Sequence, residues 1–440
     1  MFETKALTST LQRALLISIY SGRELKDSAE SLLAELGELV DTLGVPVVGR
    51  MLVHVREFQA RYLVGSGKAE EIAARVKAEN LDVVIFDNEL TPSQQRNWEK
   101  LTGIAATDRT EVILDIFAQR AQSREARLQV ELARLEHALP RLTGAWGHLI
   151  RQGGGIGNRG EGETQLEQDK RRIRNQIDRL KDELKEVRSA RATQRKDRKR
   201  TPVPNAAIVG YTNSGKSSLL RLLTGADVLV EDKLFATLDT TTRKVSLPNK
   251  QPLLLTDTVG FVRKLPHQLV ESFNATLEEA ALADFLIHLL DASQPEVIEF
   301  YNTTMKVLAE LKADARPMIV AFNKIDAVSD PAVLMRLRHH FPDALYLSVL
   351  TGEGMEALLA RMGELVAAAA TVATLFLPHA ASHLAARLHE ETRVIESEYT
   401  NEGVRLVALL PPRLAERYAA YIVEAPGQKT ADPDHLLQTN

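Results

Sequence analysis

The stretch Asn205-Ala-Ala-Ile-Val-Gly-Tyr-Thr-Asn-Ser-Gly-Lys-Ser217 decides the fold of the central part of this 440-residue chain. Its first five residues form an apolar run typical of a buried β-strand, and a helical pattern, SSLLRLLT, starts at Ser217. Between them lies the spacing G-x-x-x-x-G-K-S, in which glycines and a helix N-terminus let backbone N–H groups close around phosphate. The predicted phosphate-binding residues are Gly210, Tyr211, Thr212, Asn213, Ser214, Gly215, Lys216 and Ser217. We expect Lys216 to reach the β and γ phosphates during catalysis, and Ser217 to offer its hydroxyl to Mg²⁺.

Two further motifs follow apolar runs later in the chain. Asp257-Thr258-Val259-Gly260 comes after PLLLT, and Asn323-Lys324-Ile325-Asp326 comes after PMIVAF. In the first motif the Asp257 carboxylate can face the Mg²⁺ ion, and the Gly260 N–H can contact the γ-phosphate during catalysis. In the second, the Asp326 carboxylate can accept from both N1–H and the exocyclic amine of guanine, a donor pair that adenine lacks. Together the motifs predict a domain that binds GTP and hydrolyses it to GDP.

The remaining pattern predicts four parts in an α/β protein. Residues 201–370 contain the runs NAAIV, PLLLT, DFLIHLL, PMIVAF and ALYLS, which predict a doubly wound P-loop G domain with five parallel strands. Residues 1–108 alternate between strand-like and helix-like stretches, which predicts an N-terminal α/β domain. Residues 371–440 favour a small α+β C-terminal domain.

Residues 109–200 predict a helical hairpin, an antiparallel coiled coil. One helical stretch runs from Arg109 to Pro140, and a second is ended by the TPVP segment at 201–204. The residues of the two apolar seams are Leu128, Leu132, Leu135 and Leu139, and Leu166, Ile173, Ile177, Leu180, Leu184 and Val187. The segment 144–163 is rich in glycine, so we expect it to form a loop at the hairpin tip.

Composition excludes several function classes. The net charge is −4, but residues 170–200 hold 14 Lys and Arg against five Asp and Glu, so any nucleic-acid contact should be local. The chain has no cysteine, which excludes disulfides and thiolate chemistry and fits a cytoplasmic location. The apolar runs 14–20 and 365–377 are shorter than a membrane span, so we expect no membrane segment.

A GTPase switch also needs a residue that senses the γ-phosphate. The stretch FATLDTTTR at 235–243 contains the candidates Thr237, Thr240, Thr241 and Thr242, and the residues alone do not choose among them. Phe261, directly after the second motif, stands where many related GTPases carry a glutamine that orients the attacking water. Intrinsic hydrolysis should therefore be slow, and either a partner must order this segment or another group must position the water. Alternatively, Phe261 is only a core anchor.

The chain resembles the HflX family of ribosome-associated GTPases in five segments: FATLD (235–239), DTVGF (257–261), NKID (323–326), GGGIGNRGEGETQLEQDKRRIRNQI (153–177) and LVGSGKAEEI (63–72). The resemblance implies that Thr237 is the second Mg²⁺ ligand beside Ser217 and takes part in catalysis. It also implies two further sets of nucleotide-binding residues: Phe235, Ala236, Thr237, Leu238 and Asp239, and Ser348, Val349 and Leu350. Two positions depart from the family pattern, Thr240 in place of a proline and Val349-Leu350 in place of S-A-x.

The same resemblance implies a function and a partner. The protein would bind the large (50S) ribosomal subunit and its rRNA through the tip loop 144–163 and, with GTP bound, dissociate stalled or idle ribosomes into subunits. Arg141, Arg151, Arg159 and Trp146 suit RNA contact, because they combine positive charge with an aromatic ring among flexible glycines. We expect a cytoplasmic monomer that has no membrane contact. A ribosome-assembly GTPase and a GTP-gated protein scaffold without RNA contact remain alternatives.

Two glycine-rich segments imitate nucleotide-binding motifs. Gly65-Ser-Gly-Lys-Ala69 resembles the end of a P-loop, but Tyr62 replaces the first glycine and Ala69 has no hydroxyl for Mg²⁺. A second site for ATP in the N-terminal domain therefore stays an open alternative. The spacing G-x-G-x-x-G at 155–160 lies between helices without a preceding strand, which argues against a dinucleotide fold.

Overall fold

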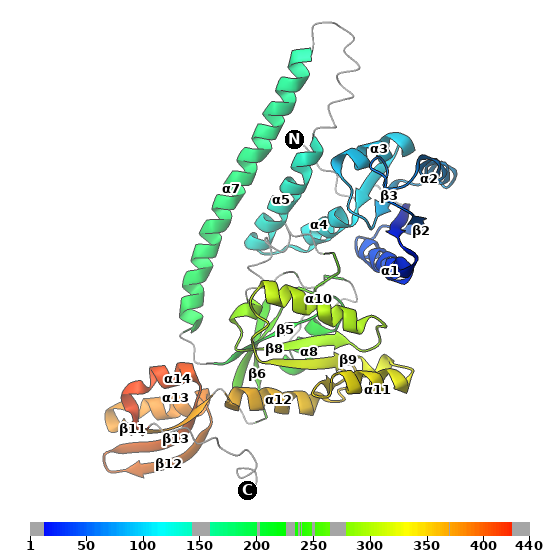
Figure 1. Ribbon diagram of the computed structural model, residues 1–440. Coiled ribbons are helices and arrows are strands. Elements are labelled where there is room, and N and C mark those ends of the chain that lie inside the picture. The colour runs from blue at the N-terminus through cyan, green and yellow to red at the C-terminus, as the bar shows by residue number, and fades with distance from the viewer. Residues whose placement is uncertain are drawn as a thin grey trace.

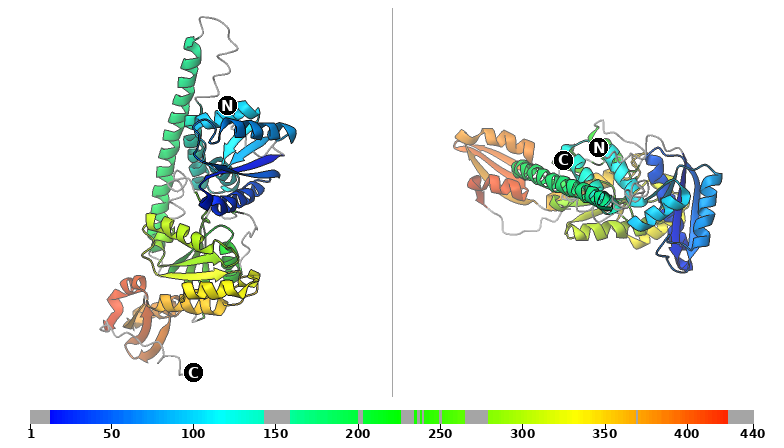
Figure 2. Two further views of the ribbon diagram at one scale, coloured as in Figure 1. Left: turned by 45° about the vertical axis from the view of Figure 1, so that its right-hand side comes forward. Right: turned by 90° about the horizontal axis from the view of Figure 1, so that it is seen from above.

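The computed structural model describes residues 13–142, 159–199, 203–225, 234–235, 238, 240–248, 251–264, 279–368 and 370–424. The G domain lies between the N-terminal domain and the C-terminal domain (Figures 1 and 2). A long helix runs beside the N-terminal domain and the G domain. Among the described residues, none of the helices combines the length and hydrophobicity needed to cross a membrane.

The N-terminal domain is a four-stranded sheet with helices on both faces. Its strands are β1 (Ala14–Ser21), β2 (Val47–Val55), β3 (Val83–Phe86) and β4 (Ala105–Asp108), and its helices are α1 (Lys26–Thr42), α2 (Ser66–Ala78) and α3 (Pro92–Thr102). All strands are parallel, in the order β2-β1-β3-β4. Because side chains alternate along a strand, Leu16 of β1 packs under α1 while Leu15 and Ile17 pack under α2 and α3. The predicted α/β fold of this region is confirmed.

Three helices follow: α4 (Arg109–Arg120), α5 (Arg124–Ala138) and α7 (Arg159–Lys199). The prediction of one helix from Arg109 to Pro140 is wrong, because the chain turns at residues 121–123 and the Ser123 hydroxyl caps α5 by accepting from the Ala126 N–H at 3.1 Å. Helix α4 packs against α1, whereas α5 packs against α7 (Figure 1). Eight of the predicted seam residues are buried or half-buried between α5 and α7: Leu128, Leu132, Leu135, Leu139, Ile173, Ile177, Leu180 and Leu184. Val187 is half-buried but does not belong to this cluster, and the Leu166 side chain lies outside the described part of the structure.

The C-terminal end of the predicted tip loop is helical instead. Residues 144–158 lie outside the described residues, and 159–163 form the first turn of α7 rather than loop. Each of the two glycines in this turn costs a helix about 1 kcal/mol, a penalty that the remaining turns of a 41-residue helix can offset. Acidic residues also follow these glycines in the sequence, and acidic residues favour a helix N-terminus.

The G domain contains a six-stranded sheet. Its strands are β5 (Asn205–Val209), β6 (Thr241–Ser246), β7 (Pro252–Asp257), β8 (Phe285–Asp291), β9 (Met318–Asn323) and β10 (Leu345–Tyr346), and its helices are α8 (Lys216–Thr224), α10 (Val297–Glu310), α11 (Pro331–His340) and α12 (Met355–Ala368). The strand order is β10-β9-β8-β5-β7-β6, and the five predicted strands are parallel. The sixth strand, β6, pairs antiparallel with β7 and was not predicted. Its sequence TTRKVS is mostly polar because it forms an edge, where only Val245 is buried.

The C-terminal domain is an antiparallel sheet with helices on one face. It contains β11 (Thr371–Pro378), α13 (His383–Glu391), β12 (Val394–Thr400), β13 (Gly403–Leu410), α14 (Pro412–Arg417) and β14 (Ile422–Glu424). The strand order is β12-β13-β11-β14, and the buried residues of β11 and β13 face α13 and α14. This is the predicted α+β arrangement, so the predicted fold class is confirmed over the described residues, while the boundaries at 108, 200 and 370 stay predictions.

Candidate GTP-binding site

The P-loop is shaped by two glycines that no other residue could replace without a clash. Gly210 has φ +151°, and a Cβ there would lie 2.1 Å from the Leu289 carbonyl oxygen. Gly215 has φ +94°, and a Cβ there would lie 2.4 Å from Asn323 Nδ2. The close approach of Gly210 to β8 and of Gly215 to the NKID segment therefore requires the glycines that the motif carries.

Lys216 is almost fully buried at the start of α8. Its Nζ donates to the carbonyl oxygens of Gly210 at 3.1 Å and Tyr211 at 2.7 Å. Burial lowers the pKa of the Lys216 ammonium to about 8, and the nearby Asp257 carboxylate opposes this shift. The ammonium is therefore held among backbone oxygens that a phosphate group, carrying full negative charge, can replace as partners.

The residues predicted to face Mg²⁺ fit a hard divalent cation. Ser217 Oγ donates to Asp257 Oδ2 at 2.6 Å, so a hydroxyl and a carboxylate oxygen meet at the ends of β7 and the P-loop. The neighbouring Thr258 Oγ1 donates to the Ile208 carbonyl oxygen at 2.7 Å, which fixes this end of β7. Oxygen ligands of this kind suit Mg²⁺, which keeps several waters and takes the rest of its shell from nucleotide phosphates. The implied second ligand, Thr237, lies outside the described residues.

The segment Asp257–Phe261 runs directly over the P-loop. Thr212 N donates to the Phe261 carbonyl oxygen at 2.8 Å, and Phe261 N donates to the Gly210 carbonyl oxygen at 3.1 Å. A Cβ on Gly260 would lie 2.7 Å from Thr212 Cγ2 and 3.0 Å from Lys216 Nζ, so only glycine fits here. The side chains of Phe261 and Val259 are buried, as the interpretation of Phe261 as a core anchor requires.

The segment NKID is held against the P-loop by Asn323. Asn323 Nδ2 donates to the Ser214 carbonyl oxygen at 2.9 Å, and its Oδ1 accepts from the Val349 N–H at 3.0 Å. Lys324 has φ +61° and forms an ion pair of 2.8 Å with Asp291 at the end of β8. The Asp326 carboxylate is exposed beside the half-buried Ile325. The loop Ser348–Leu350 thus lies next to NKID, with Ser348 buried and the Leu350 side chain 86% exposed.

The segment that precedes β6 is tied to the N-terminal half of the chain. Phe235 and Leu238 are buried, and the Phe235 ring packs edge to face on Phe117 of α4 with centroids 4.5 Å apart. Any nucleotide contact by Phe235 or Leu238 must therefore use the backbone. Ala236, Thr237 and Asp239 lie outside the described residues. Of the other threonines, Thr241 and Thr242 belong to β6, and Thr242 Oγ1 lies 2.9 Å from Thr256 Oγ1.

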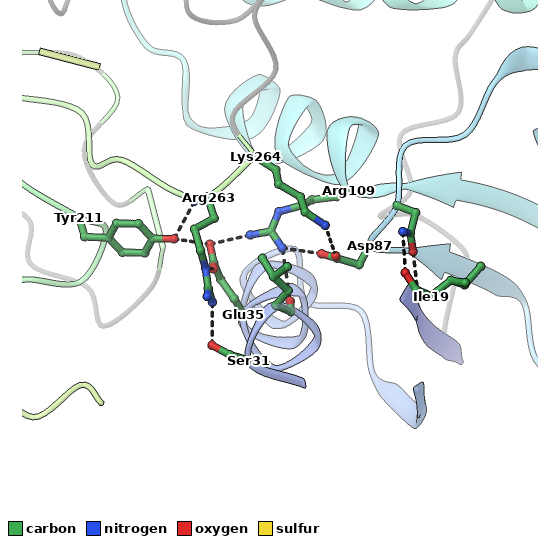
Figure 3. A network of polar contacts seen from close by, with 10 residues as sticks. Ile19, Ser31, Glu35, Asp87, Arg109, Tyr211, Arg263 and Lys264 are labelled. Atoms are coloured by element: carbon green, nitrogen blue, oxygen red, sulfur yellow. Dashed lines mark hydrogen bonds and ion pairs between the residues drawn. The ribbon is translucent and has the colours of Figure 1, made fainter. Parts of the chain in front are cut away.

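The sequence did not reveal a buried polar network between the N-terminal and G domains (Figure 3). The residues that form its ion pairs are Glu35, Asp87 and Arg109 from the N-terminal side and Arg263 and the partly exposed Lys264 from the G domain. The signal in the sequence was Glu35 itself, a charged residue between the apolar residues Leu33 and Leu36 of α1. A buried charge requires a partner, but the partner could not be named from local pattern.

The structure also shows the contacts of two other sequence-based candidates. Arg141, expected to contact RNA, donates to the Leu90 carbonyl oxygen at 3.0 Å and to Gln95 Oε1 at 2.9 Å, and it pairs with Asp108 at 3.3 Å. Its guanidinium therefore holds the C-terminal end of α5 on the N-terminal domain. In the segment 65–69, Lys68 lies in the first turn of α2 and pairs with Glu71 at 2.7 Å.

Comparisons with known proteins agree with this geometry. The model "GTP-binding GTPase N-terminal" matches residues 30–118, "GTP-binding GTPase Middle Region" matches 120–198 and "50S ribosome-binding GTPase" matches 205–324. A GTPase HflX of Akkermansia muciniphila is 47% identical over 436 residues, covering 96% of this chain and all of the relative. GTPase HflX of Escherichia coli is 41% identical over 392 residues, covering 89% of this chain and 91% of the relative.

Solved structures include a GTP-binding protein of Sulfolobus solfataricus in complex with GDP. It is 24% identical, with a TM-score of 0.43, and the match covers 81% of this chain and 98% of that chain. The P-loop, the NKID segment and the relatives above identify a GTP-binding protein that hydrolyses GTP. The chain belongs to the HflX family of GTPases.

Proposed function

We propose that this GTPase binds the large ribosomal subunit and its rRNA and, in its GTP state, dissociates stalled or idle ribosomes into subunits, after which hydrolysis releases it. The observation that carries the proposal is the match of residues 205–324 to a family described as a 50S ribosome-binding GTPase. It acts as a cytoplasmic monomer.

The hairpin provides a surface for RNA. The seam side of α7 packs on α5, which leaves Arg171, Arg172, Arg174, Arg179, Lys181 and Lys185 exposed on the other sides of the helix. Arg171 and Arg174 lie one turn apart and extend the positive surface toward the N-terminal end of α7. Contacts between such side chains and phosphates supply affinity for RNA that does not depend on the RNA sequence. The segment 144–158 adds Trp146 and Arg151, the residues proposed to reach irregular RNA.

The chemistry in the G domain is phosphoryl transfer from GTP to water. Lys216 and the backbone N–H groups of the P-loop bind the β and γ phosphates, and the Gly260 N–H stabilises charge on the transferred group. Asp326, Asn323 and the loop Ser348–Leu350 hold the guanine. Ser217 and Thr237 would hold Mg²⁺, with Asp257 facing its waters, and the bound ion would neutralise charge on the phosphates.

Pelleting the protein with purified ribosomal subunits and a non-hydrolysable GTP analogue tests the proposal. The parent protein should sediment with large subunits and not with small ones. The variant Arg171→Glu/Arg174→Glu should lose most of this binding, while Lys306→Glu/Lys312→Glu, with the same change of charge on the exposed G-domain surface, should keep it. Failure of the parent protein to sediment with large subunits would exclude the proposed partner.

The alternatives have separate readouts. A ribosome-assembly GTPase would bind precursor particles and leave mature ribosomes intact in sucrose gradients with GTP. A GTP-gated scaffold would keep its partners after the segment 144–158 is replaced, because it needs no RNA contact.

A further inference from the structure

Asp291, at the C-terminal end of β8, is a buried carboxylate that lies outside the nucleotide-binding motifs of the sequence. Its Oδ2 forms the ion pair of 2.8 Å with Lys324 Nζ. Its Oδ1 accepts from the Ser293 N–H at 3.0 Å and from Ser293 Oγ at 2.6 Å. Because each oxygen of the carboxylate has its own partner, the Asp291 side chain is held in one orientation.

The backbone places Asp291 directly beside the NKID segment. Strands β8 and β9 are parallel neighbours, and Asp291 is in register with Asn323, the first residue of that segment. The Ala292 N–H donates to the Asn323 carbonyl oxygen at 2.8 Å, so the pairing of the two strand ends extends past Asp291. The position of the carboxylate relative to NKID is therefore set by the sheet.

Lys324 is held in an unusual state by this carboxylate. Its φ of +61° is a backbone conformation that L-residues rarely adopt, and its side chain is only 30% exposed. A lysine side chain has many rotamers in water, and fixing one of them opposes binding. The ion pair with Asp291 fixes the Lys324 ammonium through contacts within the protein, so a bound base need not order this side chain.

A fixed Lys324 can support the flat face of a base. In the chain it lies between Asn323, which is bonded to the P-loop, and Asp326, which is predicted to accept from the edge of guanine. The methylene groups of a lysine stem provide an apolar surface for a flat ring while the ammonium keeps a polar partner. The order that Asp291 imposes on Lys324 therefore affects the base and not the phosphates.

We propose that Asp291 is a positioning residue that holds Lys324 in place for the guanine base and thereby slows the release of both GDP and GTP. Without this ion pair, the bound base must order the Lys324 side chain, and affinity falls by the cost of that ordering. The loss is equal for the two nucleotides, because they carry the same base. The proposal concerns nucleotide binding by the G domain and does not require a ribosome.

The test measures the release of fluorescently labelled GDP and of a labelled non-hydrolysable GTP analogue from full-length variants by stopped-flow fluorescence. Asp291→Asn keeps the shape of the side chain and an oxygen for Ser293, and it removes the charge that holds Lys324. Both nucleotides should be released roughly 3- to 10-fold faster, the effect of leaving one flexible side chain to be ordered on binding. Asp314→Asn, the same change at an exposed position of the G domain, should leave both rates unchanged.

Steady-state turnover of GTP gives a second readout. In Asp291→Asn, KM for GTP should rise while kcat stays at the parental value, since the groups that bind the phosphates are unchanged. Ser293→Ala removes the hydroxyl bond to Asp291 and keeps the ion pair with Lys324, so it should preserve both parameters. A purely structural role of Asp291 in the turn after β8 would instead make Ser293→Ala resemble Asp291→Asn, and this outcome would overturn the proposal.

Lys324→Met tests whether Asp291 acts through Lys324. This variant keeps most of the stem and removes the ammonium, so it should also release GDP roughly 3- to 10-fold faster. Asp291→Asn should add little to that rate in the Lys324→Met background, because both changes remove one ion pair. A full additional effect of Asp291→Asn would contradict the proposal. Parental release rates in Lys324→Met would also contradict it, even if Asp291→Asn fails to fold.

Discussion

The ring of Phe117 on α4 packs edge to face against Phe235, which lies just before β6 of the G domain, with centroids 4.5 Å apart. Both residues are buried in a core shared by α1, α4 and the P-loop side of the G domain. The segment predicted to sense the γ-phosphate therefore begins at an anchor on the N-terminal half of the chain.

Phe117→Ala should destabilise the protein by about 3 kcal/mol, because it removes a buried ring and leaves a cavity between the domains. Thermal unfolding followed by scanning calorimetry would show this as a lower melting temperature. Phe58→Ala, at a ring that is 51% exposed, should change it little. Equal melting temperatures for the two variants would contradict a shared core.

Lys216→Ala should abolish measurable GTP binding, because the ammonium is the main positive charge on the β and γ phosphates. In the parent protein, affinity should also fall as the pH rises through about 8, the pKa of Lys216. Above this pH the amine is neutral in the free protein, and binding must then take up a proton. Calorimetry between pH 7 and 8.7 should show a loss of about fivefold. Constant affinity across this range would mean that Lys216 stays charged throughout.

Asp326→Asn should weaken GTP binding and favour xanthosine triphosphate, because an amide can donate to the additional carbonyl of xanthine where a carboxylate only accepts. Competition binding with the two nucleotides measures the change. Asp343→Asn, at an exposed position of the same domain, serves as the control. If Asp326→Asn retains the preference for guanine, then NKID does not read the base.

GTP turnover should rise by at least about 100-fold when large ribosomal subunits are added. In related enzymes, a partner that supplies a catalytic group or orders the catalytic segment has an effect of this size. The reason lies in Phe261, whose buried side chain cannot orient water. Phosphate release with and without subunits gives the measurement. A gain below about threefold would argue against activation by the ribosome.

Replacing residues 144–158 by a Ser-rich linker of equal length should leave GTP affinity and intrinsic hydrolysis unchanged, since the G domain has its own core. Ribosome-stimulated hydrolysis and subunit dissociation should both be lost. The salt dependence of ribosome binding should become shallower, because Arg151 no longer neutralises a phosphate. Dissociation at the parental rate would show that this segment is a simple connection.

The sequence alone determined the G domain and its motifs, because each depends on a short stretch. A strand, a glycine-rich turn and a helix are specified by neighbouring residues, so the residue pattern is enough to place the P-loop and NKID at strand ends. The apolar seams of α5 and α7 were predictable for the same reason, since a helical face repeats every three or four residues. The edge strand β6 was not predicted, because polar residues occupy its exposed positions and the apolar pattern typical of a strand is therefore absent.

Tertiary structure alone decided which charges meet. Glu35 lies 176 residues before Tyr211 and 228 before Arg263, and no local pattern encodes contacts over that distance. Arg141 likewise belongs by its sequence to a basic segment suited to RNA, yet it joins the hairpin to Asp108 and Leu90. A buried charge predicts that a partner exists, because desolvation must be compensated, but only the packing of the domains selects the partner.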